Sequence, residues 1–257
     1  MIRFGLAARL GAGETVALGW ASSGSAVAAE AMASAGFAAV CLDQQHGFWS
    51  YSDLLAGVRA LQGMSVAPVI RVPHGALSDV GRMLDLGVEA VIAPMINSVD
   101  DARDLVAVGK YAPIGGRSWG PTRTKLLADL DDRALLSGSN TNQLLFAMVE
   151  TRQALDTLDA IAAVDGIDGV FVGPFDLAVS LTDGVSLTLS PDDFRATLGR
   201  VAETVAGAGK IPGIFGGSVE RARLCRDLGF RFIACGTDIG LLRDGAQAAL
   251  AAFHEKT

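Results

Sequence analysis

The chain has 257 residues, with 28 Asp and Glu against 21 Lys and Arg, which gives a formal net charge of -7. This balance argues against a nucleic-acid partner, because phosphate backbones are bound by clustered Lys and Arg, although single arginines can still bind a small anion. No apolar run reaches the roughly 18 residues that a membrane-spanning helix needs, so we expect no membrane partner.

Short apolar segments with little internal charge alternate along the chain with segments of helical periodicity. We expect strands at residues 16–20, 38–43, 67–72, 90–95, 144–150, 169–174, 211–216 and 230–236. We expect helices at residues 25–35, 51–61, 77–86, 99–109, 154–164, 191–208 and 219–228. Eight strands in this alternation predict an α/β fold of the (β/α)8 TIM barrel type. The competing doubly wound sheet usually carries a glycine fingerprint after its first strand, and residues 21–24 lack one.

The length also suits one barrel, since this fold commonly occupies about 250 residues. We therefore expect a single domain over residues 1–257, with residues 112–142 as an elaborated connection that holds a short helix at 122–136. Cys41, Cys225 and Cys235 are odd in number and lie in apolar segments. They predict reduced core residues of a cytoplasmic protein, not a disulfide framework.

Two carboxylates stand where neighbouring strands are expected to end. Glu150 closes LLFAMVE, and Asp176 follows GVFVGPF. Parallel strands carry their chemistry at their carboxyl ends, so both acids would lie on one rim and could bind a divalent cation. The alternatives are a surface ion pair between Glu150 and Arg152 and a helix cap at Asp176.

Other side chains at the strand ends would join the same rim. His46 follows the second strand, where it could be a base or a structural hydrogen-bonding residue. Arg71 lies inside PVIRVP, and a buried guanidinium needs an anion. That anion could be a structural carboxylate, a substrate carboxylate or an enolate. Trp20 and Phe215 end two further strands and could shape a substrate pocket or simply pack.

Eight segments together resemble, in order and spacing, the HpcH/HpaI family of metal-dependent pyruvate aldolases, which includes 4-hydroxy-2-oxoheptanedioate and 2-dehydro-3-deoxy-sugar-acid aldolases. The resemblance covers nearly the whole chain, and its strongest part is MVETR followed by DGVFVGPFDL. The segments are LDQQHG (42–47), PVIRVP (68–73), MLDLG (83–87), APMINSVDDA (93–102), GGRSWGP (115–121), MVETRQAL (148–155), DGIDGVFVGPFDLA (165–178) and GKIPGIF (209–215).

The resemblance implies a modified barrel with an exchanged C-terminal helix, assembled as a homohexamer (a trimer of dimers), that uses Mg²⁺, Mn²⁺ or Co²⁺. Glu150 and Asp176 would ligate the metal, and the oxo acid would chelate it. Backbone N–H groups near Phe175 and Asp176 would bind the substrate carboxylate.

The resemblance implies three more roles. Arg71 would stabilise the enolate oxygen, and His46 would transfer protons with its basicity supported by Asp85. Arg117 and Arg123 lie in the long connection, where they could reach an active site, including that of a neighbouring subunit, or be surface arginines.

The chain departs from the family pattern at two positions. Many members have Glu directly before the histidine, where this chain has Gln45, and many have Gln where it has Met148. Neither change removes a metal ligand or the base, but both alter the polarity of the pocket.

Together these features predict a divalent-metal-dependent aldolase that joins pyruvate or hydroxypyruvate reversibly to an aldehyde through an enolate. A lysine imine would be the rival solution. None of the four lysines, Lys110, Lys125, Lys210 and Lys256, ends a predicted strand. Two other functions stay open at this point: a CoA-ester lyase of the citrate lyase beta type, and a noncatalytic oligomer that binds a metabolite.

Overall fold

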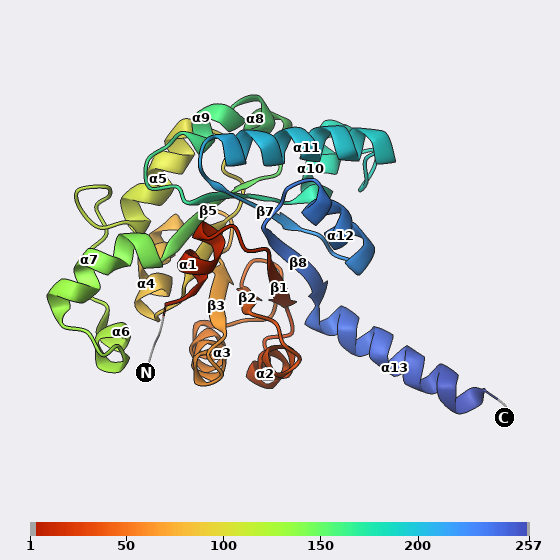
Figure 1. The fold of residues 1–257 in the computed structure, drawn as a ribbon, viewed down its shortest axis with the longest axis horizontal. Helices are drawn as coiled ribbons and strands as arrows, with labels where there is room; N and C mark the ends of the chain where they lie inside the picture. Colours follow the sequence, from red (N-terminus) through yellow and green to blue (C-terminus); the bar gives the residue numbers. More distant parts are fainter. Residues whose placement is uncertain (1–3, 256–257) are drawn as a thin grey trace.

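The computed structural model describes residues 4–255, which form a closed barrel of eight parallel strands in chain order (Figure 1). The strands are β1 (Val16–Ala21), β2 (Ala39–Asp43), β3 (Ala67–Arg71), β4 (Ala90–Ala93), β5 (Leu144–Val149), β6 (Gly169–Val172), β7 (Ile211–Phe215) and β8 (Phe232–Thr237). The barrel closes because β8 also pairs in parallel with β1. The predicted fold class is confirmed, and every strand lies within two residues of its expected bounds.

Helices connect the strands on the outside of the barrel. They are α2 (Ala26–Ser34), α3 (Tyr51–Gly63), η1 (Leu77–Asp79), α4 (Val80–Asp85), α5 (Val99–Gly109), α6 (Thr122–Leu127), α7 (Asp132–Asn142), α8 (Arg152–Asp156), α9 (Leu158–Ala162), α10 (Pro174–Leu181), α11 (Pro191–Gly207) and α12 (Val219–Asp227). The single helix expected at residues 122–136 was wrong, because the chain forms α6 and α7 there. Asp131 caps the start of α7, because its carboxylate accepts a hydrogen bond from Ala134 N, and α7 therefore begins as a separate helix after α6.

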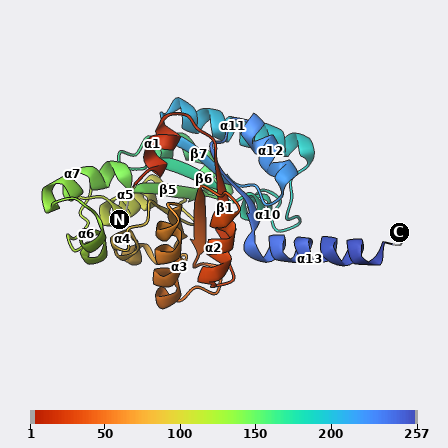
Figure 2. The same cartoon turned by 60° about the horizontal axis from the view of Figure 1, so that its bottom comes forward.

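Two helices lie outside the alternating pattern. The short α1 (Leu6–Gly11) covers the N-terminal end of the barrel with buried Leu6 and Leu10, and Glu89 accepts hydrogen bonds from the backbone N–H groups of Gly5 and Leu6. At the other end of the chain, α13 (Asp238–His254) extends away from the barrel (Figures 1 and 2). Its exchange with another subunit stays a prediction. Within residues 4–255, no helix is long and apolar enough to cross a membrane.

The inside of the barrel is filled by every second strand residue, because successive side chains point to opposite faces of a strand. Leu18, Cys41, Val69, Phe146 and Phe171 belong to this buried inner cluster. Continuing the same alternation towards the strand ends points Trp20, Asp43, Arg71 and Glu150 inward as well. Two-residue periodicity therefore aims a layer of functional side chains at the barrel axis.

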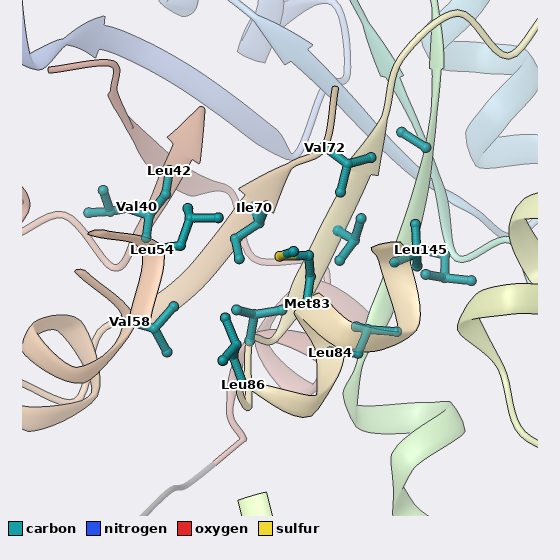
Figure 3. Packing of buried hydrophobic residues seen from close by; sticks show 14 of the residues in the cluster. Val40, Leu42, Leu54, Val58, Ile70, Val72, Met83, Leu84, Leu86 and Leu145 are labelled. Atoms are coloured by element: carbon teal, nitrogen blue, oxygen red, sulfur yellow. The ribbon is translucent and has the colours of Figure 1, made fainter. Parts of the chain in front are cut away.

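The remaining strand residues point outward and pack under the helices (Figure 3). Leu42 and Ile70 are fully buried against α3 and α4, which contribute Leu54, Val58 and Met83 to the same cluster. Burying each large apolar side chain of this kind stabilises the fold by roughly 1.5–3 kcal/mol. This outer layer fixes the strands in a register that places Asp43 directly beside Arg71.

Candidate active site

A cavity of about 350 Å³ opens at the C-terminal ends of the strands. Six of the residues proposed from the sequence line it: Trp20, His46, Arg71, Phe175, Asp176 and Phe215. Glu150 lies directly after β5 and is only 2% exposed. The barrel thus brings side chains from six separate strand ends to one place.

Arg71 is held by an ion pair with Asp43, the last residue of the neighbouring strand. Its Nε donates to Asp43 Oδ1 over 2.8 Å, and its Nη2 donates to Oδ2 over 2.7 Å. Burial alone would raise the pKa of Asp43, but the hydrogen bonds and charge of Arg71 outweigh it and lower the pKa. The pair is therefore ionised on both sides. Of the three anions left open by the sequence, the structural carboxylate is the partner within the chain.

Further contacts orient this pair. Trp20 Nε1 donates to Asp43 Oδ2 over 3.2 Å, and the backbone N–H groups of Gln45 and His46 both donate to Asp43 Oδ1. The guanidinium carbon of Arg71 lies 5.0 Å from the centre of the Trp20 ring. Among the described residues, only Nε and Nη2 of Arg71 have hydrogen-bond partners. Its Nη1 group remains available to a ligand in the cavity.

Glu150 has the opposite electrostatic situation. Its Oε1 accepts a hydrogen bond from Met95 N over 2.8 Å, and it does not pair with Arg152, whose guanidinium donates to Leu181 O. The pKa of Glu150 is raised to about 7: burial raises it most and the negative charge of Asp176 adds to the rise, while Met95 N–H and the charge of Arg71 oppose it. Two neighbouring carboxylates without a counter-cation are therefore costly for this half of the site.

Asp176 and its surroundings leave room for a ligand beside Glu150. Asp176 lies in the first turn of α10, and no described group donates a hydrogen bond to its carboxylate, so the cap expected as an alternative is not formed. Gly173 precedes this helix, and a Cβ there would lie 2.3 Å from Glu150 Oε2. Only glycine therefore allows the Glu150 carboxylate to lie across the start of α10.

The N-terminus of α10 also offers unpaired backbone donors. Pro174 has no N–H, Gly173 makes no side-chain cap, and the first helical bond runs from Leu177 N to Gly173 O. The N–H groups of Phe175 and Asp176 are left without backbone partners, at the positive end of the helix dipole. They are suited to a carboxylate.

His46 lies on the exposed side of the cavity, next to the first departure from the family pattern. Its Nε2 is 3.2 Å from Nε2 of Gln45, whose buried Oε1 has no described hydrogen-bond partner. Met148, the second departure, lines the cavity wall. Met148 thus borders the ligand space directly, whereas Gln45 contacts His46, which lines it.

Asp85 and Arg117 are not brought to this cavity within the chain. Arg117 Nη2 donates to Asp85 Oδ1 over 2.5 Å, and its Nη1 donates to Gln143 Oε1 over 2.9 Å. Gln143 directly precedes β5, so this group lies near the N-terminal ends of the strands. Arg123 donates to Leu86 O in the same region. The proposed support of His46 by Asp85 is therefore not formed inside one chain, and a role in a neighbouring subunit stays a prediction.

No lysine of the described residues lines the cavity. Lys110 is buried, donates to Asp168 Oδ2 over 2.7 Å, and belongs to the framework. Lys210 precedes β7 and donates to Ile167 O. Lys125 pairs with Asp132. Lys256 lies outside the described residues.

Three contributors were missed by reading the sequence. Asp43 could have been recognised as a charged residue that ends an apolar strand next to the strand of Arg71. Gly173 lies between a strand and a Pro-started helix, which is a signal for close backbone approach. Met95 has a left-handed backbone, with a φ of 56°, and its N–H bond to Glu150 has no sequence signal.

Comparison with known proteins extends these observations. A family model described as HpcH/HpaI aldolase/citrate lyase matches residues 17–245. A hydroxypyruvate/pyruvate aldolase of Roseovarius nubinhibens is 34% identical over 91% of this chain and 91% of its own length. A 2-keto-3-deoxy-L-rhamnonate aldolase of Klebsiella pneumoniae is 32% identical over 94% of this chain and 90% of its own.

Solved structures share the same fold. An HpcH/HpaI aldolase/citrate lyase family protein from Burkholderia cenocepacia has a TM-score of 0.88 and 30% identity, and the alignment covers 98% of this chain and 100% of that one. An HpcH/HpaI aldolase from Desulfitobacterium hafniense has a TM-score of 0.89 at 22% identity, covering 99% and 98% of the two chains. The family resemblance predicted from the motifs is confirmed.

Proposed function

Because this chain belongs to the HpcH/HpaI aldolase/citrate lyase family and is an aldolase-type lyase, we propose that it uses a divalent metal to join pyruvate or hydroxypyruvate reversibly to an aldehyde. The relatives named hydroxypyruvate/pyruvate aldolase and 2-keto-3-deoxy-L-rhamnonate aldolase support this substrate class. Their names do not agree on one aldehyde. We therefore propose the aldehyde only as a class of compound.

The observation that carries the proposal is the pair of carboxylates Glu150 and Asp176. The raised pKa of Glu150, caused first by burial and then by Asp176, marks a place where a cation would relieve the cost of two like charges. Hard divalent cations such as Mg²⁺, Mn²⁺ or Co²⁺ fit oxygen donors. No group of three or more His, Cys, Asp or Glu suited to a metal occurs in residues 4–255. Two protein ligands would leave positions for the oxo acid and water.

A bound cation would supply Lewis-acid stabilisation of negative charge on the ketone oxygen. The chain itself contributes the second stabilising group, because Arg71 is fixed by Asp43 and keeps Nη1 free for an oxyanion. The N–H groups of Phe175 and Asp176 would bind the carboxylate of the oxo acid. Together these groups would bind and orient the oxo acid in the cavity.

Proton transfer is assigned to His46, the imidazole that lines the cavity. When a 4-hydroxy-2-oxo acid is cleaved, a base takes the proton of its 4-hydroxyl group. The bond between C3 and C4 then breaks and releases the aldehyde. The electron pair of that bond stays on the oxo acid as an enolate, and protonation of C3 then gives pyruvate. In synthesis the same steps run backwards.

Assembly is part of the proposal. The extended α13 carries exposed Ile239, Leu242 and Phe253, and a mostly apolar cavity of about 540 Å³ lies between α13 and α2. Exposed apolar surface of this kind is typical of subunit contacts. We expect a homo-oligomer, a hexamer built from dimers, in which α13 packs on another subunit and Asp85 and Arg117 approach a neighbouring site.

Exchange of the methyl protons of pyruvate in deuterated water tests the proposal without knowledge of the aldehyde. We expect NMR to show exchange with Mg²⁺ and its loss when EDTA is added. Undiminished exchange in EDTA would contradict the metal requirement, and no exchange under either condition would contradict enolate formation. Arg71→Ala should lose exchange while a titration still shows metal binding.

A further inference from the structure

A row of contacting aromatic side chains leads from the catalytic cavity towards the outside of the barrel. The ring centre of Phe215 lies 5.1 Å from that of Trp20 and 6.1 Å from that of Phe175. The guanidinium carbon of Arg221 follows, 5.4 Å from the centre of the Phe175 ring and 5.6 Å from that of Phe194. The aromatic wall of the active site therefore continues into a cation held between two rings.

Arg221 has a fixed position but no anionic partner among residues 4–255. It lies in the first turn of α12, where its backbone N–H donates to the hydroxyl of the capping residue Ser218 over 3.3 Å. Across residues 4–255 its guanidinium forms no ion pair and no hydrogen bond. The first turn of a helix favours negative charge, so an arginine there is locally unfavourable. An anion bound at the guanidinium would remove that conflict.

Arg221 also faces a second cavity of about 360 Å³ that adjoins the catalytic one. The two cavities share Pro174, and Phe175, the next residue, lines the catalytic side. The charged residues of the second cavity are Arg195, Arg221 and Glu220, so its excess charge is positive. Glu220 forms no ion pair with Arg221 among the described residues. The space beyond Phe175 is thus wide enough and suitably charged for the end of an extended anionic molecule.

Resting on the aldol reaction proposed above, we propose that Arg221 binds a terminal anionic group of the acceptor aldehyde. The oxo acid takes the region between Glu150, Asp176 and Arg71, which leaves the aldehyde the side of the cavity walled by Phe175 and Phe215. Stacking between rings leaves the edge of a guanidinium free, and that edge can donate two parallel hydrogen bonds to a carboxylate or a phosphate. The residue would thereby select aldehydes by charge at the end remote from the reacting carbon.

The test compares matched pairs of aldehydes that differ in terminal charge. One pair is 4-oxobutanoate and butanal, and the other is glyceraldehyde 3-phosphate and glyceraldehyde, each with pyruvate and Mg²⁺. The variants are Arg221→Met, Arg221→Lys and the control Arg223→Met, which removes the same charge from an exposed position of α12 outside the cavity. The measured quantity is the ratio of kcat/KM for the anionic aldehyde to that for its neutral partner.

We expect the wild type to prefer the anionic member of at least one pair. Arg221→Met should lower that ratio about tenfold or more, as expected from loss of a charge-assisted hydrogen bond. Arg221→Lys should restore part of the preference, and Arg223→Met should leave it unchanged within about twofold. The pair that responds identifies carboxylate or phosphate as the preferred anion. No preference in the wild type, or equal losses for charged and neutral aldehydes in Arg221→Met, would overturn the proposal.

A binding measurement separates this proposal from the reaction on which it rests. Calorimetric titration with 4-oxobutanoate and with glyceraldehyde 3-phosphate, without oxo acid, requires no turnover. Weaker binding to Arg221→Met than to wild type and Arg223→Met would support the anion site, and equal binding would overturn it. Failure of pyruvate proton exchange would instead count against the aldol reaction.

Discussion

The two halves of the catalytic cavity differ in how their charges are balanced. On the side of β2 and β3, Asp43 and Arg71 form a buried ion pair with two hydrogen bonds, and each keeps the other ionised. On the side of β5 and α10, Glu150 and Asp176 face each other with like charges, and the pKa of Glu150 rises to about 7 because of burial and of Asp176. The first half is complete in the folded chain, whereas the second carries like charges and is where we propose that a cation binds.

This difference separates a preorganised group from a binding site. Arg71 needs no ligand to hold its position, so it can stabilise an oxyanion without reorganising during the reaction. The carboxylate pair stores a cost that a cation would relieve, which favours metal binding at that place. Each of the following changes acts on one half and leaves the other intact.

The largest effect is expected from removing a metal ligand. Glu150→Gln or Asp176→Asn should lower the rate of pyruvate proton exchange about a thousandfold or more, because several kcal/mol of charge stabilisation depend on the cation. Glu203→Gln, an exposed change on α11, serves as the control and should keep wild-type exchange. Exchange within tenfold of wild type in both ligand variants would show that the carboxylates are not the metal site.

Breaking the ion pair between Asp43 and Arg71 should mainly lower the stability of the fold. Asp43→Asn leaves Arg71 buried with an unpaired charge, so the free energy of unfolding measured in urea should fall by about 3–5 kcal/mol. The matched control is Asp100→Asn, which breaks the exposed pair with Arg103 and should change stability by less than about 0.5 kcal/mol. Equal losses in the two variants would mean that the buried pair is not the balanced unit described here.

The pH dependence of the free energy of unfolding should reveal the raised pKa of Glu150. The folded-state pKa of Glu150 is about 7, above its ordinary value of 4.5, so the folded protein holds this proton more tightly than the unfolded chain. The protonated Glu150 carboxyl therefore stabilises the fold below about pH 4.5, and this stabilisation is lost as the pH rises to about 7. In the presence of a chelator, the free energy of unfolding should change by about 3 kcal/mol over this range. Urea unfolding of wild type and Glu150→Gln isolates the contribution, since the variant lacks this titration. Identical pH profiles for the two proteins would contradict the raised pKa.

A smaller effect is expected from crowding the carboxylate. Gly173→Ala would place a Cβ 2.3 Å from Glu150 Oε2, so the carboxylate must move and metal affinity should fall about 10- to 100-fold in a calorimetric titration. Gly199→Ala, where the nearest contact of the new Cβ is an ordinary 3.8 Å, should bind the metal as wild type does. Unchanged affinity in Gly173→Ala would show that this glycine does not shape the site.

The barrel could be predicted from the sequence because the apolar pattern that marks each strand is local. Segments such as LLFAMV are apolar at every position, as expected for a strand buried on both faces, and all six residues are buried. The short α1 was missed because its position depends on covering the barrel end and on Glu89, which is distant in sequence. The break between α6 and α7 carried a local signal, the capping Asp131, within a run of acidic residues.

The residues of the candidate site that follow the ends of strands could be predicted from the sequence. Trp20, His46, Arg71, Asp176 and Phe215 reach one cavity because parallel strands end on the same side of a barrel. Their partners depend on contacts between segments that are distant in sequence. Asp43 pairs with Arg71 through the alignment of β2 with β3, and Asp85 pairs with Arg117 near the opposite end of the barrel.

The family, the barrel and the set of residues at its rim follow from the amino-acid sequence, because apolar periodicity and strand ends are encoded locally. Tertiary structure decided how the charges are balanced, since burial and proximity arise only when distant segments meet. The same residue types, an arginine and carboxylates at strand ends, form an ion pair in one half of the cavity and a pair of like charges in the other. Packing and register made that distinction.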